Sequence, residues 1–94
     1  MAQPIYKMFY ARMTEAWFQL SKEEQKVLFD KVEKVLKKVG GKSMITCDST
    51  WCSEEWWFWG VEEFPTLEAI QEHAKLLGEL DWGRYCHAET LLGT

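Results

Sequence analysis

Residues 55–64 read EWWFWGVEEF, and this stretch decides the fold because it carries large apolar side chains at both odd and even positions. A β-strand turns alternate side chains to opposite faces of its sheet, so both faces of this strand are apolar. Such a strand belongs in the interior of a sheet that is covered on each side. We predict a central strand over residues 55–64, with Gly60 marking a bulge or a close backbone approach.

The segment before this strand predicts a first strand and a long helix. Residues 5–13 read IYKMFYARM, contain neither Gly nor Pro, and predict a strand that is substantially apolar on both faces. After a connection, Ser21 and Glu24 have the spacing of a capping box, which opens a helix with apolar residues on one face. Gly40-Gly41 ends that helix, because glycine accepts the left-handed conformation that follows a helix end.

Three more elements complete the expected order. Residues 42–48 suit a short strand, and Thr66 is the expected N-cap of a second helix with an apolar stripe. Residues 82–92 then predict a last strand, with Trp82 and Cys86 on one face and Tyr85 on the other. These elements give the order βαββαβ within one domain that spans residues 1–94.

This order predicts an α+β protein with the ferredoxin-like fold. Right-handed crossovers place both helices on one face of an antiparallel sheet with the strand order 4-1-3-2. The other face would meet water, although the central strands are apolar there, and each exposed Trp or Tyr would forgo roughly 2 kcal/mol. We therefore expect a homodimer in which the sheets of two copies pack face to face.

The chain resembles the dimeric α/β-barrel superfamily over nearly its whole length. The resemblance rests on the first strand, the helix that ends at Gly40-Gly41, the aromatic third strand, and residues 64–73, FPTLEAIQEH, which are similar to a helix of antibiotic-biosynthesis-monooxygenase-type members. It implies a dimeric ferredoxin-like barrel. Members of the superfamily include cofactor-independent oxygenases, haem-degrading oxygenases, chlorite dismutase relatives, isomerases and proteins without a known activity, and fold alone does not choose among them.

Composition argues against several classes of partner. The net charge of −4 argues against a nucleic-acid binder, and no apolar run is long enough to cross a membrane. Residues 1–4, MAQP, show no secretory leader, and the three cysteines form no CxxC motif. We expect reduced thiols, no metal site and a cytoplasmic protein.

Two histidines are the candidate catalytic residues. His73 lies three residues after Ile70, so helical spacing turns it toward the sheet, where it could act as a general base. The resemblance adds a second role, since haem-degrading members use a helix histidine as the proximal haem ligand. The strand Asn of those enzymes is missing here. His87 and Glu89 share one face of the last strand and could form a general-base pair.

Aromatic and basic side chains form the expected substrate site. Trp57 and Trp59 should share one face of the central strand, and Trp56 and Phe58 the other. An arginine on a strand could bind a carboxylate. The residues that we expect to contact substrate are Tyr6, Tyr10, Arg12, Trp57, Trp59 and Tyr85.

These observations predict that a small apolar or aromatic molecule binds between helices and sheet, without a cofactor. The activity could be a cofactor-independent monooxygenation, in which His73 or His87 deprotonates an acidic phenol while aromatic side chains exclude water. The alternatives are a haem-binding protein that uses His73 and a non-catalytic dimeric interaction module.

Overall fold

The computed structural model describes residues 3–94, so Met1 and Ala2 of the segment inspected for a leader lie outside it. Residues 3–94 form one sheet and two long helices, together with two helices of a single turn. In chain order the elements are β1 (Ile5–Met13), α1 (Glu15–Phe18), α2 (Lys22–Lys38), β2 (Lys42–Asp48), β3 (Phe58–Phe64), α3 (Leu67–Glu79), α4 (Trp82–Tyr85) and β4 (Cys86–Gly93).

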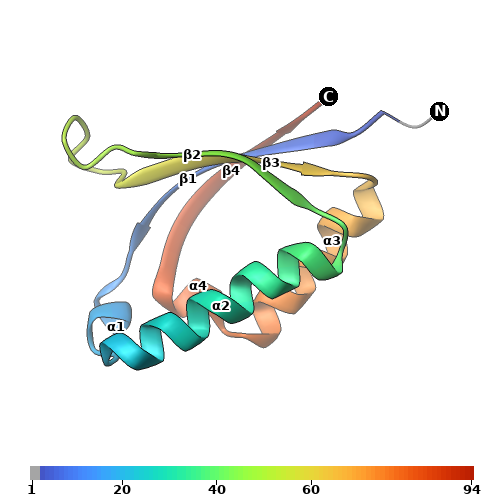
Figure 1. Ribbon diagram of the computed structural model, residues 1–94. Coiled ribbons are helices and arrows are strands. Elements are labelled where there is room, and N and C mark those ends of the chain that lie inside the picture. Colours follow the sequence, from blue (N-terminus) through green and yellow to red (C-terminus); the bar gives the residue numbers. More distant parts are fainter. Residues whose placement is uncertain (1–2) are drawn as a thin grey trace.

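The sheet has the predicted topology. Its strand order is β2-β3-β1-β4, which is the expected order read from the other edge, and every neighbouring pair is antiparallel. The two aromatic strands, β1 and β3, are therefore central. Figure 1 shows α2 and α3 together on one side of the sheet, with no helix on the other side. The predicted α+β, ferredoxin-like arrangement is confirmed.

Strand register assigns each side chain to one of two faces. Lys7 of β1 pairs with Glu62 of β3, and both line the space between sheet and helices. Tyr10, three positions along β1, pairs with Trp59 on the opposite face. We call this second side the open face, and its members from the four strands include Tyr6, Met8, Tyr10, Arg12, Ile45, Cys47, Trp59, Val61, Glu63, His87, Glu89 and Leu91.

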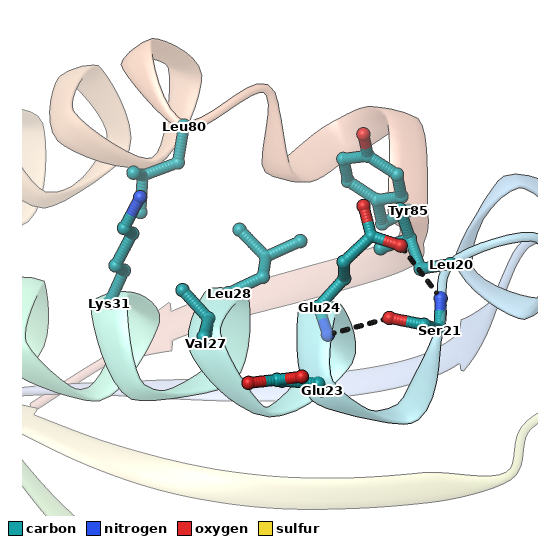
Figure 2. Close-up of a pocket in the computed structure, with 9 residues that line it drawn as sticks. All are labelled: Leu20, Ser21, Glu23, Glu24, Val27, Leu28, Lys31, Leu80 and Tyr85. Atoms are coloured by element: carbon teal, nitrogen blue, oxygen red, sulfur yellow. Dashed lines mark hydrogen bonds between the residues drawn. The ribbon is translucent and has the colours of Figure 1, made fainter.

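Local signals set the ends of the helices. The hydroxyl of Ser21 accepts a hydrogen bond from the Glu24 amide (3.1 Å), and the Glu24 carboxylate accepts one from the Ser21 amide (2.9 Å), as Figure 2 shows. This capping box starts α2 where the sequence predicts. Gly40 follows its end with φ of 81°, a conformation that favours glycine. Thr66 caps α3 through a hydrogen bond to its hydroxyl from the Ala69 amide (3.1 Å).

Two predicted strands begin later in the structure than in the sequence interpretation. Trp82–Tyr85 form the one-turn helix α4, because Asp81 adopts a left-handed φ of 57° and accepts a bond from the Arg84 amide (3.1 Å). The prediction of a strand from residue 82 was therefore wrong at its start, and Tyr85 is not a strand residue. Residues 55–57 also precede β3, and the Trp56 amide donates to the Ser53 hydroxyl (3.0 Å).

The interior is small. The hydrophobic residues with less than a tenth of their surface exposed are Ala11, Phe64, Ile70 and Cys86. Gly60 lies where three strands approach closely, since a Cβ at this position would stand 2.8 Å from the Phe9 ring and 2.7 Å from the Ile45 carbonyl. The predicted close approach at Gly60 is thereby confirmed, whereas the irregularity in register lies on β2 between Ser43 and Ile45.

No helix within residues 3–94 has both the length and the apolar character that a membrane crossing needs.

Candidate functional site

A cavity of about 550 Å³ lies between the sheet and the two long helices. Alternate positions of β1, β3 and β4 form its floor, because a strand turns every second side chain to the same face. The apolar stripes of α2 and α3 form its roof. The apolar lining includes Phe9, Ala11, Phe58, Val32, Leu36 and Leu77. Size and lining are typical of a pocket for a small organic molecule.

Aromatic side chains enclose one part of this cavity. The rings of Trp17 and Trp82 meet edge to face, with centroids 5.9 Å apart, and both line the cavity. The helical turn that was not predicted, α4, is what brings Trp82 to this position. Thr14 holds that turn against β1, since its hydroxyl donates to the Arg84 carbonyl (2.6 Å) and its amide donates to the Tyr85 carbonyl (2.9 Å).

Three ionisable side chains line the same cavity, and we call them the polar cluster: Lys7, Glu62 and His73. Lys7 and Glu62 are direct partners across β1 and β3, and His73 comes from α3 above them. His73 is 3% exposed, and its Nδ1 lies 3.5 Å from the Lys7 ammonium nitrogen. An ammonium group only donates hydrogen bonds, so Nδ1 accepts and the proton of the neutral ring lies on Nε2.

Burial perturbs every member of the polar cluster. It lowers the pKa of His73 to about 4, and the positive charge of Lys7 adds to this effect. Burial also lowers the pKa of Lys7, against the opposing attraction of Glu62, and it raises the pKa of Glu62, against the attraction of Lys7. His73 is therefore a neutral imidazole at pH 7. Such clusters of perturbed groups in a cleft mark candidate functional sites.

Cys86 lies in the cavity wall and is 8% exposed. Burial raises the pKa of its thiol to about 11. The thiolate is the nucleophilic form of cysteine, so Cys86 is inert at neutral pH. It contributes shape and apolar surface to the cavity.

The structure separates the predicted site residues into two groups. His73 lies in the cavity as expected, but Tyr6, Tyr10, Arg12, Trp59, His87 and Glu89 all lie on the open face. The sheet stands between these residues and the cavity. His87 and Glu89 therefore do not act on the same bound molecule as His73 within one chain.

Trp56 organises the aromatic side chains of the open face. Its ring stacks on His87, with centroids 5.7 Å apart and planes at 9°. The rings of Trp56 and Tyr10 meet edge to face, with centroids 5.0 Å apart. The Arg12 guanidinium lies 5.9 Å from the Trp56 centroid. The predicted partnership of Trp56 with Phe58 was wrong, because Phe58 lines the cavity and the chain has no strand geometry at residues 55–57.

Trp57 and Tyr85 lie outside the cavity as well. Trp57 packs on Phe18 of α1, with centroids 5.8 Å apart. Tyr85 lines a shallow groove of about 420 Å³ between α2 and the α3–α4 corner, which Figure 2 shows with Leu28 and Leu80 on its two walls. Charged side chains at the start of α2 border this groove, and it shares no lining residue with the cavity that holds the polar cluster.

Sequence reasoning missed Lys7 and Glu62. The signal was available, since Lys7 interrupts the apolar set formed by Ile5, Phe9 and Ala11 on one face of the first strand. A charge at such a position has to be paired or solvated, and here it faces a cavity. Glu62 occupies the corresponding position on the partner strand.

Comparison of the chain with family models and with curated proteins gives no match. Solved structures of similar fold include a doubly substituted chlorite dismutase from Candidatus Nitrospira defluvii (18% identity, TM-score 0.71) and that enzyme in complex with imidazole (16%, 0.72). Each likeness covers 95% of this chain and only 39% of the dismutase chain.

A protein of unknown function from Rhodopseudomonas palustris is similar over 96% of this chain and 80% of its own length, with 15% identity and a TM-score of 0.66. These likenesses concern the fold, which agrees with the antiparallel sheet and its helices. The chain therefore shares its fold, an antiparallel four-stranded sheet with two long helices on one face in the ferredoxin-like arrangement, with these solved structures.

Proposed function

We propose that the chain binds a flat, largely apolar molecule in the cavity between the sheet and α2 and α3. One observation carries this proposal: a cavity of about 550 Å³ with mainly apolar walls holds a polar cluster at which His73 is almost fully buried. Apolar walls supply affinity, and a few placed polar groups supply orientation. Small proteins fill their interiors closely, so a space of this size indicates a ligand.

A cavity-filling substitution tests this proposal. Ala88 lines the cavity from β4, whereas Leu91 lies on the open face of the same strand. Ala88→Trp should abolish binding of the fluorescent apolar probe N-phenylnaphthylamine, and Leu91→Trp should leave the probe affinity within about twofold. Extraction and mass analysis of purified wild-type protein would identify a natural ligand. Equal probe binding by both variants would refute the proposal.

Haem is a second candidate, favoured by the state of His73. Metals bind the neutral imidazole, and burial keeps His73 neutral at pH 7. The resemblance to a superfamily with helix-histidine haem ligands points the same way. The donor fits, with His73 as the protein ligand and the apolar walls around the ring. Haem supplies an iron that binds small ligands and exchanges electrons.

The haem proposal places one demand on the polar cluster. An iron at Nε2 requires the ring proton to lie on Nδ1, and a metal-bound histidine usually donates that proton to a carboxylate or carbonyl. Glu62 is the carboxylate in the polar cluster that could accept it. Lys7 would then have to release Nδ1.

The two histidines of the chain make a matched pair for the haem test. Haem titrated into wild-type protein should give a shifted Soret band that His73→Ala removes and added imidazole restores. His87→Ala should behave as wild type, because His87 lies on the open face. A Soret band unchanged by His73→Ala would exclude the assigned ligand.

Cofactor-independent monooxygenation needs a base that deprotonates the bound substrate. His73 is the histidine in the cavity, but a pKa of about 4 makes it a weak base toward a phenol. His87 and Glu89 lie on the other side of the sheet. The activity therefore draws its support from the apolar walls of the cavity alone. Substrate-dependent oxygen uptake that His73→Ala abolishes would establish it.

A second copy of the chain is the proposed cover of the open face. Met8, Ile45 and Leu91 are 38%, 48% and 64% exposed there, beside aromatic residues of the central strands. Packing two such faces together removes apolar surface from both copies, in the isologous manner of two-fold dimers. Sedimentation as a stable monomer at micromolar concentration would contradict this assembly.

A further inference from the structure

We infer that the polar cluster binds an anionic group, such as a carboxylate or sulfonate, carried by an otherwise apolar aromatic molecule, and that the Lys7 ammonium is its main contact. This inference rests on the proposed function and adds to it the chemical class of the ligand.

The first support is the position of Lys7. Its side chain projects from the central strand β1 into the cavity between two apolar neighbours on the same face, Ile5 and Phe9. A lysine in such surroundings is rarely buried unless it is paired. β1 is hydrogen-bonded to β3 on one side and to β4 on the other. The strand therefore cannot turn to bring Lys7 to the other face of the sheet.

The second support is the set of partners that Lys7 has. Among residues 3–94, its recorded contact is the 3.5 Å approach to His73 Nδ1, and no carboxylate oxygen lies within 4.0 Å of its nitrogen. An ammonium group has three N–H donors. At least two of them are therefore free for a bound molecule, and charge-assisted hydrogen bonds to an anion are the strong ones.

The third support is that His73 offers a donor beside Lys7. Because its Nδ1 accepts from Lys7, its Nε2 carries a proton that no described residue accepts. Ammonium and imidazole N–H groups together form a site that recognises an anion. Glu62 works against an anion, since its carboxylate lies on the neighbouring strand directly opposite Lys7. Removal of its charge should therefore strengthen binding.

The surrounding walls define the rest of the ligand. Beyond the polar cluster the cavity presents aromatic and aliphatic side chains, among them Phe58, Trp82 and Leu77. A small hydrophilic anion would leave these walls unfilled. An aromatic ring system with one acidic substituent matches both parts of the cavity.

Two fluorescent probes with the same ring system test the inference. Anilinonaphthalene sulfonate is an anion, and N-phenylnaphthylamine is its uncharged counterpart. Each is titrated into the wild-type chain and into Lys7→Met, Glu62→Gln and Lys75→Met. Lys75 lies exposed on α3 and outside the cavity lining, so its substitution makes the same charge change elsewhere.

Lys7→Met should weaken sulfonate binding about tenfold or more without weakening the binding of the uncharged probe, because the added Met side chain is apolar. Glu62→Gln should tighten sulfonate binding several-fold, and Lys75→Met should change neither affinity. Equal effects of Lys7→Met on both probes, or no effect, would overturn the inference.

The cavity-filling variant Ala88→Trp distinguishes failure of the anion-site inference from failure of the proposed function. If it abolishes both probes while Lys7→Met does not discriminate between them, the cavity binds apolar molecules but the anion site is wrong. If both probes still bind Ala88→Trp, the cavity is not their site, and both proposals fall.

Discussion

His73 illustrates how one buried side chain ties stability to pH. Its imidazole is 3% exposed beside the Lys7 ammonium, so the folded protein resists protonating it. Burial lowers its pKa from 6.5 to about 4, and the unfolded chain therefore binds this proton more readily than the folded one. The stabilising effect is complete above pH 6.5 and is lost as the pH falls toward 4.

We predict that the free energy of unfolding falls through this window by up to about 3 kcal/mol on account of His73. Urea unfolding of wild type and His73→Leu at several pH values between 7.5 and 4 measures it, and the difference between the two proteins isolates His73 from shared carboxylates. That difference should shrink or reverse in favour of the variant at low pH. A difference independent of pH would contradict the assignment.

Residue-level prediction from the sequence succeeded where periodicity was regular. Helical spacing placed His73 toward the sheet, and the structure agrees. It did not find Lys7 or Glu62, because the charge of Lys7 stands out in an apolar set but the sequence does not show which side chains lie beside it. Only the register of β1 with β3 and the helices above them turn these two charges into neighbours in one cavity.

At the scale of elements, Gly60 sets how closely the central strands approach each other. A methyl group there would stand within 3 Å of the Phe9 ring and of the Ile45 carbonyl, one on the cavity side and one in the backbone of β2. The backbone cannot move away without disturbing the hydrogen bonds between β2 and β3. A side chain at position 60 would therefore disturb both the cavity, through Phe9, and the sheet, through Ile45.

We predict that Gly60→Ala lowers the free energy of unfolding by about 1–3 kcal/mol through overpacking. Gly83 is the matched control, because no atom lies within 4 Å of an added Cβ and it sits in the one-turn helix α4. Gly83→Ala should be neutral or slightly stabilising. Chemical denaturation of the two variants makes the comparison, and equal destabilisation would show that close packing is not the cause.

Elements with strong local signals were predicted with their bounds. Residues 5–13 form β1, residues 42–48 form β2, and the capping box starts α2. The starts of β3 and β4 were missed for a different reason. Trp56 has a strand-forming side chain, but its amide donates to the Ser53 hydroxyl in a turn, whereas the Trp57 amide still donates to the Ala11 carbonyl of β1. Trp82 follows Asp81, whose left-handed backbone is not indicated by any sequence pattern. Local backbone turns therefore set the starts of both strands.

In the molecule as a whole, the two faces of the sheet have different surroundings. The face toward the helices encloses a cavity, and the open face carries apolar residues that α2 and α3 do not reach. The strand order that produces this division was predictable from element order and handedness. A binding site between the helices and the sheet was also predicted, but its volume and its lining were not, because they depend on how far the helices stand from the sheet.

We predict that Met8→Arg converts the proposed dimer into a monomer, because two arginines would enter the interface between facing sheets. Val27 offers a matched control, since it is 49% exposed on α2, away from the open face, against 38% for Met8. Val27→Arg should remain dimeric. Analytical ultracentrifugation of both variants at micromolar concentration tests this, and an unchanged molecular mass for Met8→Arg would place the interface elsewhere.

Alternation along β1 has one more consequence. Lys7, Phe9 and Ala11 contribute to the cavity, while Tyr6, Met8 and Tyr10 contribute to the opposite side. Neighbouring residues of one strand thus serve the two proposed roles separately. Randomising the odd positions should change the proposed ligand preference and spare the proposed dimer interface, and randomising the even positions should do the reverse, so laboratory selection could address each role on its own.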